Sequence, residues 1–266
     1  MNLGKSAVLT SVEILSPCPS AQYEEALKNL SRCLGIFICD SSPWDMRVAK
    51  AFCSIGNIYS QMGMLAEALA MYEKDLQITA HNLQPGDVRL ADTKYNVGLA
   101  SCRVGRYSEG LAFLEKALET RIAALGSHHT DVADALICIG GVHSCIGRHA
   151  EALERYQRAT SIRKAALGPD HVAVALSLRN SASARTCLGQ TDPAIEECGE
   201  AHAILLHQLG PDHRLTAEAK QLLVDVATSN PRARVCPPHP LISEHHPPSV
   251  ANRLAQRVFT ARDRLC

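Results

Sequence analysis

The chain has 266 residues, and its 27 lysines and arginines are balanced by 27 aspartates and glutamates. Hydrophobic residues make up 46% of it and aromatic residues only 4%. The apolar content excludes a disordered chain, and the neutral charge is unlike that of non-specific nucleic-acid binders, so we expect no nucleic-acid partner. The apolar runs are far shorter than the ~20 residues that span a bilayer, so we also expect no transmembrane segment.

Residues 1–20 are expected to form an irregular N-terminal segment, because Pro17 and Pro19 interrupt any helix there. This segment lacks the clean apolar core and the cleavage site of a secretory signal. The 11 cysteines are scattered, and no two have C-x-x-C spacing. We therefore predict reduced thiols, no metal site, no cofactor and a cytoplasmic location.

A period of 42 residues runs through the middle of the chain. Three residue types repeat with it: Gly63, Gly105, Gly147 and Gly189; Ala49, Ala91, Ala133, Ala175 and Ala217; and Leu83, Leu125, Leu167 and Leu209. Three independent sets with one period do not arise by chance, so the chain is predicted to consist of structural repeats.

Each repeat is predicted to be a hairpin of two helices. On both sides of each turn glycine, apolar residues recur at spacings of three and four, which is the period of an amphipathic helix. Gly126, Gly168 and Gly210 can take the left-handed conformation that ends a helix. Ser42-Pro43 is predicted to start the first complete hairpin as an N-cap followed by a proline. One hairpin cannot bury its apolar stripe alone, whereas stacked hairpins can.

Small residues recur inside the first helix of each hairpin, where the two helices should approach closely. They are Gly56, Gly98, Gly140 and, in the fourth repeat, Ala182. A glycine inside a helix costs about 1 kcal/mol relative to alanine, so its recurrence indicates a packing requirement.

These positions resemble the tetratricopeptide repeat. Its Leu-Gly pair resembles Ile55-Gly56, Val97-Gly98 and Ile139-Gly140, its second-helix alanine resembles Ala68, Ala152 and Ala194, and its aromatic residue resembles Tyr72 and Tyr156. The 42-residue length and the LGPDH linker resemble the longer variant found in kinesin light chains. The resemblance implies an all-α fold, a right-handed superhelical solenoid of antiparallel helix hairpins. The fourth repeat departs from the pattern, because Ser181 replaces the large apolar residue and Cys198 the aromatic one.

The resemblance divides the chain into four parts. Segment 1–20 precedes a repeat domain at 21–227, which holds four full repeats at about 44–213 and partial repeats on both sides. Residues 228–249 are predicted to be a Pro- and His-rich linker, and 250–266 a basic amphipathic helix. Three roles stay open for this helix: covering the end of the array, binding a partner, or contacting an anionic membrane.

The stripe of each first helix that is turned away from the second helix should line a concave surface. The predicted peptide-binding residues on it are Asn57, Tyr95, Asn96, Arg103, Arg179 and Asn180. Asparagine carries a donor and an acceptor, so it can bond a peptide backbone in both directions. The two arginines favour acidic peptides, whereas Asp92 and Asp134 are expected nearby and weaken that preference. The alternative is that these are ordinary polar residues on a solvated surface.

No hydrolase, zinc-protease or phosphate-loop motif occurs in the sequence, so we expect no enzyme. His143 occupies an aromatic position of the repeat and is expected to be packed rather than catalytic. The expected function is a scaffold or adaptor that binds a peptide segment of a partner protein, and a kinesin light chain-like cargo adaptor is one form of it. The alternative is a structural or self-assembling repeat segment without a dedicated groove ligand.

Overall fold

The structure is a computed structural model that describes residues 20–228. These residues form ten α-helices and no strand: α1 (Ser20–Asp40), α2 (Met46–Gln61), α3 (Leu65–Asn82), α4 (Val88–Arg103), α5 (Tyr107–Leu125), α6 (Thr130–Cys145), α7 (His149–Leu167), α8 (Val172–Cys187), α9 (Thr191–Leu209) and α10 (Arg214–Ala227). The predicted N-terminal segment, linker and basic C-terminal helix lie outside the described residues, apart from Ser20 and Thr228.

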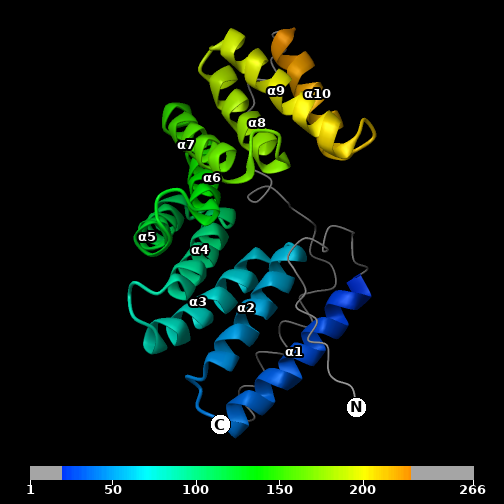
Figure 1. Cartoon of the computed structure of the whole chain (residues 1–266). Coiled ribbons are helices and arrows are strands. Elements are labelled where there is room, and N and C mark those ends of the chain that lie inside the picture. Colours follow the sequence, from blue (N-terminus) through cyan, green and yellow to red (C-terminus); the bar gives the residue numbers. More distant parts are fainter. Residues whose placement is uncertain (1–19, 229–266) are drawn as a thin grey trace, which may run out of the picture.

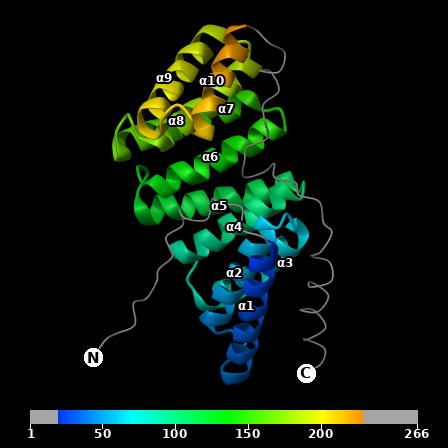
Figure 2. The ribbon, with the colours of Figure 1, turned by 90° about the vertical axis from the view of Figure 1, so that its right-hand side faces the viewer.

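Each helix packs against the next helix in the chain, so the hairpins α2–α3, α4–α5, α6–α7 and α8–α9 stack in sequence order (Figures 1 and 2). We call α2, α4, α6, α8 and α10 the A helices, and α3, α5, α7 and α9 the B helices. Successive A helices from α4 to α8 contact one another, whereas successive B helices do so less. The stack therefore curves with its A helices inside, and the predicted solenoid of helix hairpins is confirmed.

The A helices begin at a repeated N-cap. Asp45, Asp87, His129, His171 and His213 precede them, and each side chain accepts a hydrogen bond from the backbone N–H two residues further on. This bond satisfies one of the donors that a helix start leaves without a partner. The predicted N-cap at Ser42 is therefore wrong.

The first complete hairpin begins three residues after that serine. Asp45 accepts a hydrogen bond from the backbone N–H of Arg47 at 2.7 Å. Ser42 and Pro43 belong to the turn before it, where the carbonyl of Ser42 accepts a hydrogen bond from the N–H of Asp45. A carboxylate caps a helix at least as well as a hydroxyl, and it can also hold the Arg47 guanidinium.

Glycine ends helices both at the turn inside a hairpin and at the turn between successive hairpins. At Gly147, φ is 79° and the N–H of Arg148 donates to the carbonyl of His143 at 2.8 Å, as in a Schellman motif. At Gly168, φ is 89° and ψ is 158°, a combination that is essentially restricted to glycine. The predicted helix ends are thus present at these glycines.

Inside each hairpin, the A helix and the B helix meet at the small residues. A Cβ atom on Gly140 would lie 2.7 Å from the ring of Tyr156, and one on Gly56 would lie 2.8 Å from the ring of Tyr72. The second-helix alanines Ala68, Ala152 and Ala194 are all buried. In the second hairpin the A helix meets backbone, because a Cβ atom on Gly98 would lie 2.9 Å from the carbonyl oxygen of another glycine, Gly110. The glycines therefore allow aromatic rings or backbone to pack directly against an A helix.

Candidate functional site

Three of the predicted peptide-binding residues lie on α4 and connect it to both neighbouring A helices. The amide of Asn96 donates to Cys53 Sγ on α2 at 3.7 Å, and Arg103 donates to Ser60 Oγ on α2. On the other side, the hydroxyl of Tyr95 lies 2.7 Å from Cys138 Sγ on α6. Each partner is 43 residues away, one more than the repeat length, so all three bonds join successive repeats with the same offset.

The other three residues do not join this cluster. Asn57 is exposed on α2, and its side-chain oxygen accepts a hydrogen bond from the Tyr72 hydroxyl at 2.7 Å. Arg179 and Asn180 lie on α8, two repeats along, where Arg179 donates to Glu218 of α10 at 2.9 Å. Between the two groups, α6 presents small and apolar positions. The predicted residues thus form one polar cluster around α4 and a second pair on α8.

Two arginines of the B helices, Arg121, which is buried, and Arg163, which is partly buried, were not anticipated from the sequence. Arg121 donates to Asp92 at 2.7 Å and to the carbonyl of Asp131 at 3.1 Å. Arg163 repeats this arrangement 42 residues later, donating to Asp134 of α6 at 2.6 Å and to the carbonyl of Ala173 of α8 at 2.9 Å. The sequence could have indicated these pairs, since both the arginines and the aspartates repeat with the 42-residue period.

These arginines change the electrostatics of the A-helix face. Asp92 and Asp134 neutralise Arg121 and Arg163, rather than the predicted arginines of the groove. The charge of Arg179 is already matched by Glu218. Arg103 and Arg179 thus both have partners within the array, which weakens the predicted preference for acidic peptides.

The buried cysteines and histidine near this polar cluster pack in the interior and are not set up for catalysis. Burial raises the pKa of the Cys138 thiol to about 11 and that of Cys102 to about 12, so neither is a thiolate near pH 7. His143 is 7% exposed, and burial, followed by the charge of Arg155, lowers its pKa. Within residues 20–228, no three His, Cys, Asp or Glu side chains are grouped as metal ligands would be.

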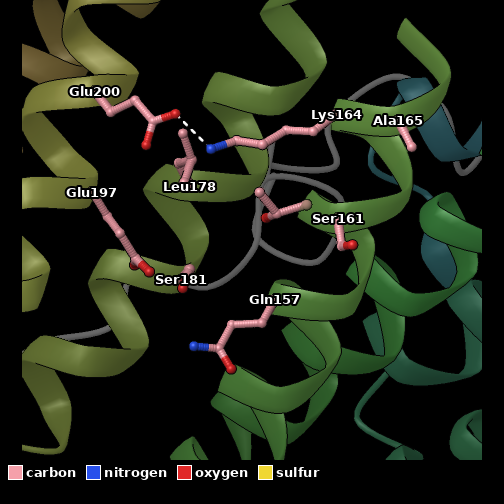
Figure 3. A pocket seen from close by; sticks show the side chains of 9 residues that line it. Gln157, Ser161, Lys164, Ala165, Leu178, Ser181, Glu197 and Glu200 are labelled. Atoms are coloured by element: carbon pink, nitrogen blue, oxygen red, sulfur yellow. Dashed lines mark hydrogen bonds and ion pairs between the residues drawn. The ribbon is translucent and has the colours of Figure 1, made fainter. Parts of the chain in front are cut away.

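A pocket of about 650 Å³ lies elsewhere, between the B helices α7 and α9 and over α8. Figure 3 shows its lining side chains, none of which is a predicted peptide-binding residue. The sequence signal for this pocket was Ser181, which stands where the earlier repeats have a large apolar residue. No helix of the described residues is long and apolar enough to cross a membrane.

Comparison with known proteins identifies the repeats. Two tetratricopeptide repeat family models match the chain, one at residues 49–82 and the other at 89–165 and 131–205. These matches begin within α2 and end within α9, and they leave out residues 83–88. A search of curated proteins found no relative of the chain.

Solved structures share the fold at low sequence identity. The Podosopora anserina putative kinesin light chain repeats are 20% identical, with a TM-score of 0.62 over 71% of this chain and 90% of that one. BtubC (BKLC) from P. vanneervenii is 17% identical, with a TM-score of 0.62 over 91% and 90% of the two chains. Aspartyl phosphate phosphatase F from Bacillus subtilis is 15% identical, with a TM-score of 0.66 over 81% of this chain and 54% of that one. Together with the family matches and the 42-residue hairpins, they show that the chain belongs to the tetratricopeptide repeat family, with repeats like those of kinesin light chains.

Proposed function

We propose that this chain is a protein–protein interaction adaptor that binds a peptide segment of a partner protein along its A-helix face. Tetratricopeptide repeats are scaffolds for protein interactions and are generally not enzymes. The observation that carries the proposal is the polar cluster on α4, whose side chains bond to α2 and α6 and are thereby held in place before any ligand arrives. Preorganised groups lose less conformational entropy when they bind.

The two asparagines at the same repeat position define the length of the bound segment. Asn96 uses one of its two N–H groups on Cys53, and its other N–H and its oxygen can bond a peptide backbone. Asn180 stands two repeats further along, half-buried on α8. With about 10 Å between neighbouring helices, the two side chains are roughly 20 Å apart, which is about six residues of extended peptide.

The test is peptide selection followed by a binding titration. Peptides selected from a random library on the full chain should bind saturably in fluorescence anisotropy. The double variant Asn96→Ala/Asn180→Ala should weaken this binding at least tenfold, because each lost backbone bond contributes about 1 kcal/mol. The control is Asn29→Ala, which removes an exposed asparagine from α1. Equal affinity of the double variant and the wild type would reject the A-helix face as the site.

The alternative function is a structural or self-assembling repeat segment. It predicts a concentration-dependent oligomer in light scattering that the asparagine variants do not change, together with no saturable peptide binding. A kinesin light chain-like cargo adaptor role would be the more specific form of the first proposal. The cytoplasmic location and the contact of the C-terminal helix with a partner or an anionic membrane stay predictions, and that helix lies outside the described residues.

A further inference from the structure

The pocket between α7, α8 and α9 has a polar lining. Figure 3 shows side chains of α7 on one side, those of α9 on the other, and those of α8 between them. The lining consists of Gln157, Thr160, Ser161, Lys164 and Ala165 of α7, Leu178 and Ser181 of α8, and Glu197 and Glu200 of α9. Its volume of about 650 Å³ is within the usual range of ligand pockets, ~300–1,000 Å³.

Two polar positions at the base of this pocket are apolar one repeat earlier. There, Ile139 occupies the position of Ser181, and Leu118 occupies that of Thr160. Both are buried in the hydrophobic core. One further repeat back, the position of Ser181 is Val97, which is also buried. The smaller Ser181 therefore accounts for the space between α7 and α9, which the earlier repeats close.

Two buried polar atoms in this pocket have no hydrogen-bond partner. Ser181 is 1% exposed, and its hydroxyl is unpaired. Glu197 accepts a hydrogen bond from Arg185 on Oε1 at 2.9 Å, while its buried Oε2 has no partner. A buried polar group without a hydrogen-bond partner destabilises the protein, and a charged group does so more strongly. A ligand that donates hydrogen bonds to both atoms would recover that cost.

The acceptors of the pocket favour a ligand that donates hydrogen bonds. Of the two carboxylates that line it from α9, Glu200 is paired with Lys164 at 2.6 Å (Figure 3), whereas Glu197 is paired with Arg185 through only one of its oxygens. The equivalent residues of α7 in the preceding repeat are Arg155 and Arg158, so the charge on this helix is reversed here, while Glu115 and Glu119 of the facing helix are replaced by the neutral Gln157 and Ser161. Glu197 already holds the guanidinium of Arg185 on its other oxygen.

We propose that this pocket binds the guanidinium group of an arginine side chain from a partner protein. The guanidinium carries five N–H donors in a planar fork and is less strongly hydrated than an ammonium, so it can pair with Glu197 Oε2 and Ser181 Oγ together at little desolvation cost. This inference goes beyond the proposed function, because the pocket lies between B helices and contains none of the predicted peptide-binding residues. Its outcome is independent of peptide binding on the A-helix face.

The test uses capped amino acids and the full chain. In ¹H–¹⁵N NMR titrations, N-acetyl-argininamide should shift the amide signals of Ser161, Leu178 and Ser181 saturably, with a Kd on the order of 1 mM. N-acetyl-lysinamide should bind at least fivefold more weakly, and the neutral N-acetyl-glutaminamide should give no saturable shift. Absence of these shifts with the arginine probe would overturn the proposal, as would equal binding of any two probes.

Variants should move the affinity in opposite directions. Ser181→Ile, which restores the side chain of Ile139, should abolish binding while leaving the melting temperature equal or higher; Ser181→Val serves if the isoleucine does not fit. Glu197→Gln should weaken binding at least tenfold, whereas Glu196→Gln, an exposed neighbour outside the pocket, should not.

Lys164→Met should tighten binding several-fold, because it releases Glu200 and removes the competing cation. A purely structural role for these residues would not produce this gain. Unchanged binding in Ser181→Ile and Ser181→Val, or weaker binding in Lys164→Met, would contradict the site.

Discussion

In each hairpin, a residue of the A helix packs against a residue of the B helix 16 positions further on, and the sizes of the two side chains are complementary. Gly140 faces the ring of Tyr156, so its missing side chain makes room for the ring. In the fourth repeat the first position is Ala182 and the second is Cys198, and both are buried. From the third repeat to the fourth, the B helix thus loses an aromatic ring where the A helix gains a methyl group. The apparent irregularity of the fourth repeat is a second solution to the same packing problem.

This size matching predicts how substitutions combine. Gly140→Ala should lower the free energy of unfolding by about 1–3 kcal/mol, although alanine favours helix, because its Cβ would lie 2.7 Å from the Tyr156 ring. The double variant Gly140→Ala/Tyr156→Cys copies the fourth repeat. In urea unfolding, it should cost at least 1 kcal/mol less than the sum of the two single changes.

The matched control is Gly199→Ala on α9, where a new Cβ would meet nothing within 4 Å. This change should raise the free energy of unfolding by up to about 1 kcal/mol. Strict additivity of the two changes in the third hairpin, or a stabilised Gly140→Ala, would show that the ring and the glycine are not coupled.

The repeat positions could be predicted from the sequence because they depend on local rules. Turn glycines such as Gly147 require a positive φ, and the helical period follows from burial of one stripe. The contacts between repeats could not be predicted in this way. Asn96 meets Cys53 at a step of 43 residues, not 42, since that step depends on how neighbouring helices are offset in space. The pocket was missed for the same reason, because Ser181 was visible as a substitution but the space that it opens was not.

At the scale of the helix, the A helices differ in the chemistry of their N-caps. The first two caps are aspartates, and the next three are histidines. A histidine caps through an unprotonated Nδ1, as His171 does for the N–H of Ala173 at 3.1 Å. It adds no negative charge to the positive end of the helix dipole. The later A helices therefore have the hydrogen bond of the cap without its charge.

Replacing His171 by Asp should stabilise the protein by about 0.5–1 kcal/mol, which corresponds to a rise in melting temperature of roughly 1–4 °C. His171→Asn, which caps without a charge, should leave the melting temperature close to that of the wild type. His171→Ala should lower the free energy of unfolding by about 1 kcal/mol. Thermal unfolding followed by circular dichroism measures all three. A melting temperature for His171→Asp at or below that of His171→Asn would rule out the contribution of the charge.

At the scale of the whole molecule, two arginines of the B helices connect the repeats in the middle of the array. Arg121 connects α5 to Asp92 of α4 and to the first turn of α6, and Arg163 makes the equivalent connections from α7 to α6 and α8. At the end of the array the equivalent residue is Leu205, which is buried among apolar side chains. Since repeat arrays are stabilised by interfaces between neighbours, such bonds determine how far unfolding of one repeat spreads.

Arg163→Leu, which copies Leu205, should therefore uncouple the C-terminal helices from the rest. The change removes hydrogen bonds from a guanidinium to Asp134, Ser177 and a backbone carbonyl, each contributing about 1.5–3 kcal/mol at most. Hydrogen exchange measured by mass spectrometry should show a loss of protection in α8–α10 that exceeds the loss in α2–α5. The urea transition should broaden, because the array no longer unfolds as one unit. Arg158→Leu, an exposed change on the same helix, is the control and should leave both unchanged. A uniform loss of protection along all ten helices would mean that cooperativity is carried by apolar packing between hairpins, and not by the arginines.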